Sequence, residues 1–217
     1  MLFRNDGNLK FTDVTTEAGF MVTGSWMGLA FGDYDLDGEM DFYVIGMSST
    51  TARRLDSLGI GPSDKPEHNA GRAAMGYGNR MFLRRGDGYE LAPFNDQVAR
   101  SGWSWGASTF DFDNDGDHDI FVANGHLSGN STADYCTTFW RHDIYTDDSQ
   151  DNAARENMFQ FVMSPLQETD ISWNGYEHKV LWMNEGGGAF TNVAYLFGVA
   201  FEYDGRAVVT EDLDADG

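Results

Sequence analysis

The sequence predicts an all-β fold, a partial β-propeller of four-stranded antiparallel blades with long loop insertions. Short runs rich in β-branched and aromatic residues, as at 29–31, 42–45 and 120–122, indicate strands. An acidic stretch separates the first two strands of each unit, and a glycine-rich hairpin follows further along the chain. The unit is therefore strand, acidic loop, strand, connection, strand, glycine turn and strand. Four antiparallel strands with a loop at a fixed position are typical of a propeller blade.

The acidic stretches carry the strongest chemical signal. Residues 33–41 read Asp-Tyr-Asp-Leu-Asp-Gly-Glu-Met-Asp, residues 111–119 read Asp-Phe-Asp-Asn-Asp-Gly-Asp-His-Asp, and a third stretch begins at residue 212. Unit charges ~4 Å apart repel by about 4 kcal/mol at an effective dielectric of ~20, so such a turn needs a cation among its carboxylates. Ca²⁺ fits because it accepts about six to eight oxygen ligands in irregular geometry. Gly38 and Gly116 supply the left-handed backbone that folds each loop over the ion.

Spacing assigns a role to each loop position. Side chains at the first, third and fifth positions point inward, the seventh residue offers its backbone carbonyl, and the ninth completes the shell. An EF-hand would need glutamate at the twelfth position, where Val44 and Val122 stand. The alternative is a solvated acidic hairpin turn, since Asp and Gly are ordinary turn residues. The expected Ca²⁺ ligands are Asp33, Asp35, Asp37, Glu39, Asp41, Asp111, Asp113, Asp115, Asp117, Asp119, Asp212, Asp214 and Asp216.

Glycine-rich hairpins define the rest of each unit, at 2–14, 81–91 and 181–193. A propeller needs at least ~4 blades to close its ring, so we expect the remainder of a larger propeller as a partner. A short helix is expected at 153–163. The predicted organisation is an outer hairpin of a preceding blade at 1–24, a blade at 25–100 with an insertion at 47–78, a blade at 101–195 with an insertion at 125–178, and the start of a truncated blade at 196–217.

Composition narrows the class of protein. A net charge of −21 over 217 residues argues against nucleic acid or an anionic membrane as partner. The single cysteine, Cys136, excludes an intrachain disulfide, and no apolar run approaches the ~20 residues of a membrane span. No secretory signal opens the sequence. Because weak Ca²⁺ sites match Ca²⁺ levels outside cells, we expect an extracellular, periplasmic or cell-surface location, with any signal peptide absent from this chain.

The motifs resemble a known repeat family. Residues 31–44 and 110–122 are similar to the FG-GAP/VCBS repeat, and the Leu-Phe-x-Asn-x-Gly hairpin at 2–7 accompanies that repeat in the ASPIC/UnbV, cartilage acidic protein-like branch. The resemblance implies a β-propeller like the integrin α-subunit head, with Ca²⁺ in the inter-strand loops. One departure is Thr109-Phe110, which stands where the family has Phe-Gly before Asp111.

The leading functional hypothesis is a non-enzymatic binding or adhesion scaffold in which the metal is structural. Its ligand, a protein or a carbohydrate, would bind at the rim formed by the insertions. The side chains of Trp140 and Trp173 are candidates for stacking on a sugar or a protein group, or are packing residues.

The alternative hypothesis is a carbohydrate-active hydrolase or lyase on the same scaffold. His126 and His142, with Asp134 and Asp143, would supply general acid and base groups. The competing interpretation is that both histidines only pack or form hydrogen bonds in the insertions. Cys136 has no charged neighbour in sequence that would activate its thiol as a nucleophile.

Overall fold

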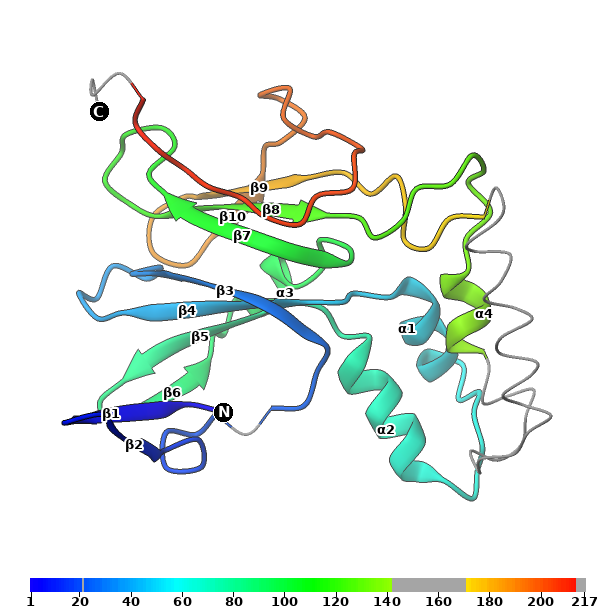
Figure 1. The fold of residues 1–217 in the computed structure, drawn as a ribbon, viewed down its shortest axis with the longest axis horizontal. Coiled ribbons are helices and arrows are strands. Elements are labelled where there is room, and N and C mark those ends of the chain that lie inside the picture. The colour runs from blue at the N-terminus through cyan, green and yellow to red at the C-terminus, as the bar shows by residue number, and fades with distance from the viewer. Residues whose placement is uncertain (21, 142–170, 214–217) are drawn as a thin grey trace.

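The computed structural model describes residues 1–20, 22–141 and 171–213 and shows a mostly β protein (Figure 1). Two four-stranded antiparallel sheets hold most of the strands, so the prediction of such sheets is confirmed. Strands adjacent in each sheet are also adjacent in the chain, which makes both sheets meanders. The first sheet has the order β3 (Trp26–Gly32), β4 (Asp41–Gly46), β5 (Arg80–Arg85) and β6 (Gly88–Leu91). The second runs through β7 (Ser104–Phe110), β8 (Asp119–Asn124), β9 (Val180–Asn184) and β10 (Phe190–Asn192).

The two sheets share their pairing register. Gly32 pairs with Asp41 across the first acidic loop, and Phe110 pairs with Asp119 across the second. The first strand of each sheet also has an irregular pairing near its start, between Trp26 and Gly28 in β3 and at the matching place in β7. The acidic loops therefore occupy equivalent places in the two sheets.

The main core lies between the sheets, which pack face to face (Figure 1). Tyr43, Ile45 and Leu83 from the first sheet meet Ile120 and Val180 from the second, and all five side chains are buried. Each such side chain contributes about 1.5–3 kcal/mol of hydrophobic free energy.

The outer face of each sheet is apolar as well. Phe42, Val44 and Phe82 form a cluster that the segment around Phe20 covers on the first sheet. On the second sheet, Leu181 and its neighbours are covered by residues 193–200. Because both faces are buried, all six residues of β4 are buried and the strand lacks the polar–apolar alternation of a half-exposed strand.

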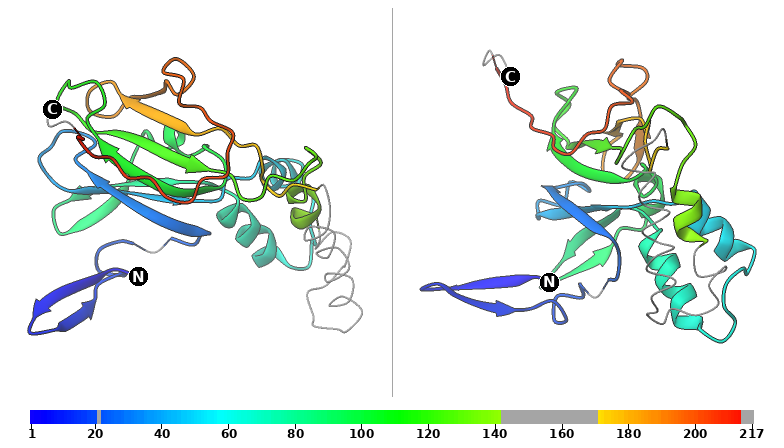
Figure 2. Two further views of the ribbon diagram at one scale, coloured as in Figure 1. Left: turned by 45° about the horizontal axis from the view of Figure 1, so that its top comes forward. Right: turned by 45° about the vertical axis from the view of Figure 1, so that its right-hand side comes forward.

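A separate hairpin, β1 (Phe3–Gly7) with β2 (Lys10–Asp13), precedes the first sheet and projects away from it (Figure 2). Its strands are mostly exposed.

Three of the four described helices gather at one end of the sheets, in the 47–78 insertion and the described start of the second insertion (Figures 1 and 2). The 47–78 insertion was expected only as a long connection, but it forms two helices, α1 (Thr50–Ser57) and α2 (Pro66–Met75). Local signals were present, because the Ser49 hydroxyl caps α1 by accepting the Ala52 N–H and Pro66 opens α2. The helix expected at 153–163 lies outside the described residues. The remaining helices are α3 (Asn95–Val98) and α4 (Cys136–Trp140).

Candidate metal centres

The first acidic loop joins β3 to β4 and the second joins β7 to β8, and both have the same backbone form. Leu36 and Gly38 take φ of 62° and 87° in the first loop, and Asn114 and Gly116 take 58° and 95° in the second. The expectation of left-handed glycines at these positions is confirmed.

The first aspartate of each loop caps the turn from inside. The two carboxylate oxygens of Asp33 accept the N–H groups of Asp37 (3.1 Å) and Gly38 (2.9 Å). In the second loop Asp111 accepts the N–H groups at the same offsets, over 3.1 and 3.0 Å. These local bonds form the turn by themselves, so a shared backbone form alone is no proof of a metal.

The ninth residue of each loop is an anchor. Asp41 is fully buried, and its carboxylate accepts the N–H of Tyr34 (2.9 Å) and that of Arg84 (2.8 Å). The loop is thereby tied to the third strand of its own sheet. Burial raises the pKa of Asp41 above its usual range. Asp119 is anchored in the same way by the N–H groups of Phe112 (2.7 Å) and Asn184 (2.8 Å).

Carboxylate oxygens converge in both loops. Those of Asp33, Asp35 and Asp37 lie within 4.8 Å of one another, and so do those of Asp111, Asp113 and Asp119. One oxygen of Asp35 is buried and has no hydrogen-bond partner among the described residues. All-oxygen donor sets of this kind are those that Ca²⁺ and Mg²⁺ use, so the residues present fit a hard divalent cation.

Asp117 adds a side chain that the sequence did not indicate as a ligand. Only its backbone carbonyl was expected to face the ion, yet the side chain is 4 % exposed. Its Oδ1 has no partner in the described part of the chain. Burial, and then the charges of Asp115 and Asp119, raise the pKa of Asp117 to about 6. The counterpart in the first loop, Glu39, is exposed and pairs with Arg84 at 3.3 Å.

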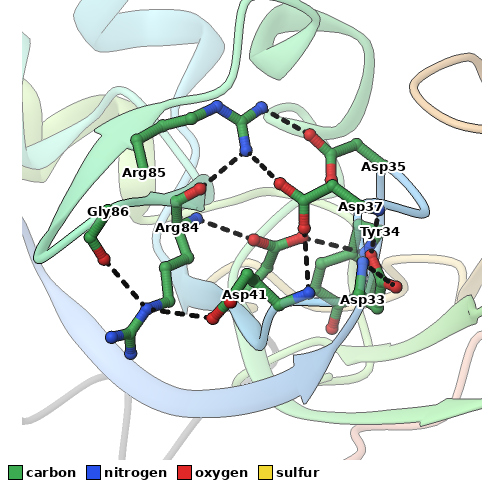
Figure 3. A network of polar contacts seen from close by, with 10 residues as sticks. Asp33, Tyr34, Asp35, Asp37, Asp41, Arg84, Arg85 and Gly86 are labelled. Carbon is green, nitrogen blue, oxygen red and sulfur yellow. Dashed lines mark hydrogen bonds and ion pairs between the residues drawn. The ribbon is translucent and has the colours of Figure 1, made fainter.

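A cation from the protein itself occupies the first loop. The guanidinium of Arg85 bridges the carboxylates of Asp35 and Asp37, with a distance of 2.7 Å to Asp37 (Figure 3). Arg85 lies at the end of β5, 48 residues beyond Asp37, and no local pattern in the sequence pointed to this contact.

The first loop also contacts the neighbouring sheet. The buried Tyr34 hydroxyl forms a 2.7 Å hydrogen bond with Thr109 on β7. The backbone carbonyl of Tyr34 accepts a hydrogen bond from the Asn184 side-chain amide at 3.1 Å. The backbone N–H of Asp33 donates to His118 of the second loop at 3.2 Å. An ordered first loop therefore supports the packing of one sheet on the other.

The third acidic stretch is described only in part. Asp212 lies within the described residues, whereas Asp214 and Asp216 lie outside them. Their expected role as ligands stays a prediction.

A polar cavity of about 370 Å³ opens at the rim between α1 and the second insertion, and we call it the rim cavity. Asp134, Asn174 and Glu177 line it together with Arg53 and Arg100. The side chain of Asn174 is 8 % exposed, and its Oδ1 has no partner in the described ranges. Burial raises the pKa of both Asp134 and Glu177. Six further lining residues carry a hydroxyl group: Ser48, Ser49, Thr50, Thr51, Ser101 and Thr137.

The residues of the enzymatic alternative are only partly described. His126 packs among Trp103, Trp105 and Trp173, and burial lowers its pKa. Its Nδ1 is buried without a partner in the described part of the chain, and it is not among the residues that line the rim cavity. His142 and Asp143 lie outside the described residues.

Two other residues singled out in the sequence are also placed. Cys136 lines the rim cavity, where burial raises the pKa of its thiol and favours the unreactive neutral form. Trp140 is 5 % exposed within an apolar cluster, so the expectation that it stacks on a ligand does not fit this packing.

No protein-family model, curated protein or solved structure matches this chain. The resemblance to FG-GAP/VCBS repeats therefore rests on the motifs alone. None of the helices within 1–20, 22–141 and 171–213 has the length and apolar character needed to cross a membrane.

Proposed function

We propose that the protein is a calcium-binding segment of an FG-GAP/VCBS-type propeller that serves as an extracellular binding or adhesion scaffold. The observation that carries the proposal is the pair of loops with one backbone form and converging carboxylates at equivalent places in two sheets. Carboxylates at the first and third positions converge in both loops, with Asp37 as the third member in one and Asp119 in the other, which makes a solvated acidic turn the weaker explanation.

The metal would be structural. Bound Ca²⁺ supplies positive charge that offsets repulsion among the carboxylates of each loop. Asp41 then holds the loop on β5, while Tyr34 holds it on β7 of the other sheet. A loop that is ordered in this way stabilises the contact between neighbouring sheets, which in a propeller are neighbouring blades. The remainder of such a propeller is the expected partner.

Calcium titration tests the metal. We expect the melting temperature to fall in EDTA and to recover with Ca²⁺, and to recover less with Mg²⁺, which demands octahedral geometry and gives up water reluctantly. Asp113→Ala should lose part of the Ca²⁺-dependent rise, whereas Asp87→Ala, in an exposed hairpin turn, should keep all of it. An unchanged melting temperature with chelator, together with no heat of Ca²⁺ binding by calorimetry, would refute the metal role.

The rim cavity is the proposed ligand site, and a carbohydrate is the ligand class it suits best. Its lining residues carry hydroxyl, amide, carboxylate and guanidinium groups that suit sugar hydroxyls, and the Asn174 Oδ1, which has no partner among the described residues, offers an acceptor. Binding to a glycan array tests this. Arg53→Ala should weaken the signal and Arg54→Ala, one residue along the same helix and outside the cavity lining, should not. Equal glycan binding by the two variants would show that the ligand does not bind in the rim cavity, and a protein ligand would then be the alternative to test.

A further inference from the structure

The residues that follow the third strand show how the two loops differ. The N–H of Arg84 binds Asp41 in the first sheet, and the N–H of Asn184 binds Asp119 in the second, so these positions are equivalent. The next residue is Arg85 in the first sheet and Glu185 in the second. Each is followed by a glycine with positive φ, at 60° and 93°, so the two turns also correspond.

The first loop has its own counter-ion. Two nitrogens of the Arg85 guanidinium contact the third- and fifth-position carboxylates, Asp35 and Asp37, and one of them also donates to the Arg84 carbonyl at 2.6 Å. Arginine presents several N–H groups in a rigid fork, which lets it bridge two carboxylates as a divalent cation would (Figure 3). The Arg85 side chain is 40 % exposed, so it can swing out to solvent when another cation arrives.

No such group contacts the second loop in the part of the chain that the structure describes. Glu185 is exposed and adds a negative charge, and across the described ranges no ion pair joins a basic side chain to residues 111–119. Its carboxylates include the buried Asp117, whose Oδ1 finds no partner within residues 1–20, 22–141 and 171–213. An oxygen that is removed from water and left without a donor points to a ligand that the protein does not provide.

We propose that Arg85 is a built-in counter-ion that offsets the carboxylate charge of the first loop without metal and competes with Ca²⁺ there, so that the second loop is the tighter site. This inference rests on the proposed function. Ca²⁺ must displace the guanidinium from Asp35 and Asp37 to enter the first loop, whereas the second loop offers an uncompensated set of carboxylates. We expect the second loop to bind Ca²⁺ at least tenfold more tightly, a difference equivalent to about 1.4 kcal/mol.

Exchanging the two residues provides the test, with calorimetric titration of Ca²⁺ and melting in EDTA as readouts. The Asp113→Ala background disables the second loop, so that titration measures the first loop alone. The Asp35→Ala background disables the first loop, so that titration measures the second. Arg85→Glu should raise the affinity of the first loop at least tenfold and lower the melting temperature in EDTA. Glu185→Arg should lower the affinity of the second loop at least tenfold and raise the melting temperature in EDTA.

Charge-matched controls separate the local effect from net charge. Glu90→Arg on β6 and Arg54→Glu on α1 make the same charge changes at exposed positions outside the loops, and each should alter either affinity less than threefold. If the two loops of the wild type bind Ca²⁺ with equal affinity and neither exchange changes that affinity, the counter-ion role of Arg85 is wrong, and the proposed function stands. No Ca²⁺ binding by the wild type at all would overturn both.

Discussion

Replacing Asp41 with alanine tests whether the ninth loop residue is an anchor independent of metal. The carboxylate is fully buried and satisfies two backbone N–H groups, those of Tyr34 and Arg84, over 2.9 and 2.8 Å. Alanine leaves both donors without an acceptor in a site that water does not reach freely.

The expected cost follows from these two bonds. A buried donor left unpaired costs about 1–3 kcal/mol, so the two together cost about 2–6 kcal/mol. Part of this is offset, because the variant no longer buries a carboxylate whose pKa burial has raised. We therefore expect Asp41→Ala to lose about 3 kcal/mol, which for a chain of this size lowers the melting temperature by about 6–12 °C.

Urea denaturation in EDTA, followed by tryptophan fluorescence, measures this loss without a contribution from metal. Asp41→Asn keeps one acceptor and should fall between the wild type and Asp41→Ala. The exposed Asp87→Ala should stay within about 0.5 kcal/mol of the wild type. If Asp41→Ala also stays within that range in EDTA, the anchor role is wrong and Asp41 matters only as a metal ligand.

Three further predictions test the pH response, the turn and the core. The pKa of Asp117 is about 6 in the folded protein against an ordinary 3.8, so the folded state holds this proton more tightly than the unfolded state. Stability in metal-free buffer should therefore fall as pH rises from about 4 to about 6. Thermal melts should show a steeper fall in the wild type than in Asp117→Asn, which keeps only the contributions of other carboxyls whose pKa burial raises, such as Asp41 and Glu177. With saturating Ca²⁺ the trend should reverse, because binding needs ionised carboxylates; a metal-free protein that gains stability over this interval would contradict the assignment. In Gly116→Ala the added methyl group has no atom within 4 Å, but alanine is forced to φ of +95°, so we expect a loss of about 1–2 kcal/mol in the free energy of unfolding and weaker Ca²⁺ binding. Unchanged urea and calorimetric titrations would argue against a required left-handed turn. Leu83→Ala removes a side chain that is 2 % exposed between the sheets and should cost about 2–5 kcal/mol in urea, whereas a cost below 1 kcal/mol would show that the two sheets do not share a core.

The sequence alone determined the parts of this protein that depend on near neighbours. The acidic turn is local, because the bonds from the Asp33 carboxylate span four and five residues and the left-handed glycine lies within the same loop. The strands on either side were predictable from their β-branched and aromatic residues, and the hairpins from their glycines. Helices α1 and α2 were missed although Ser49 and Pro66 mark their starts, because turn residues in a long connection suit a loop equally well.

Only the tertiary structure decided which of the loop carboxylates have their negative charge offset by a basic side chain. Arg85 reaches Asp35 across 50 residues of chain, and Asp117 is buried with a hydrogen bond from the backbone of Gly186, in the turn after β9. Likewise, Trp140 is withdrawn from the rim by packing with residues of the first insertion. Electrostatic compensation and burial are set by distances in space, and spacing along the chain fixes those distances only within a turn or a hairpin.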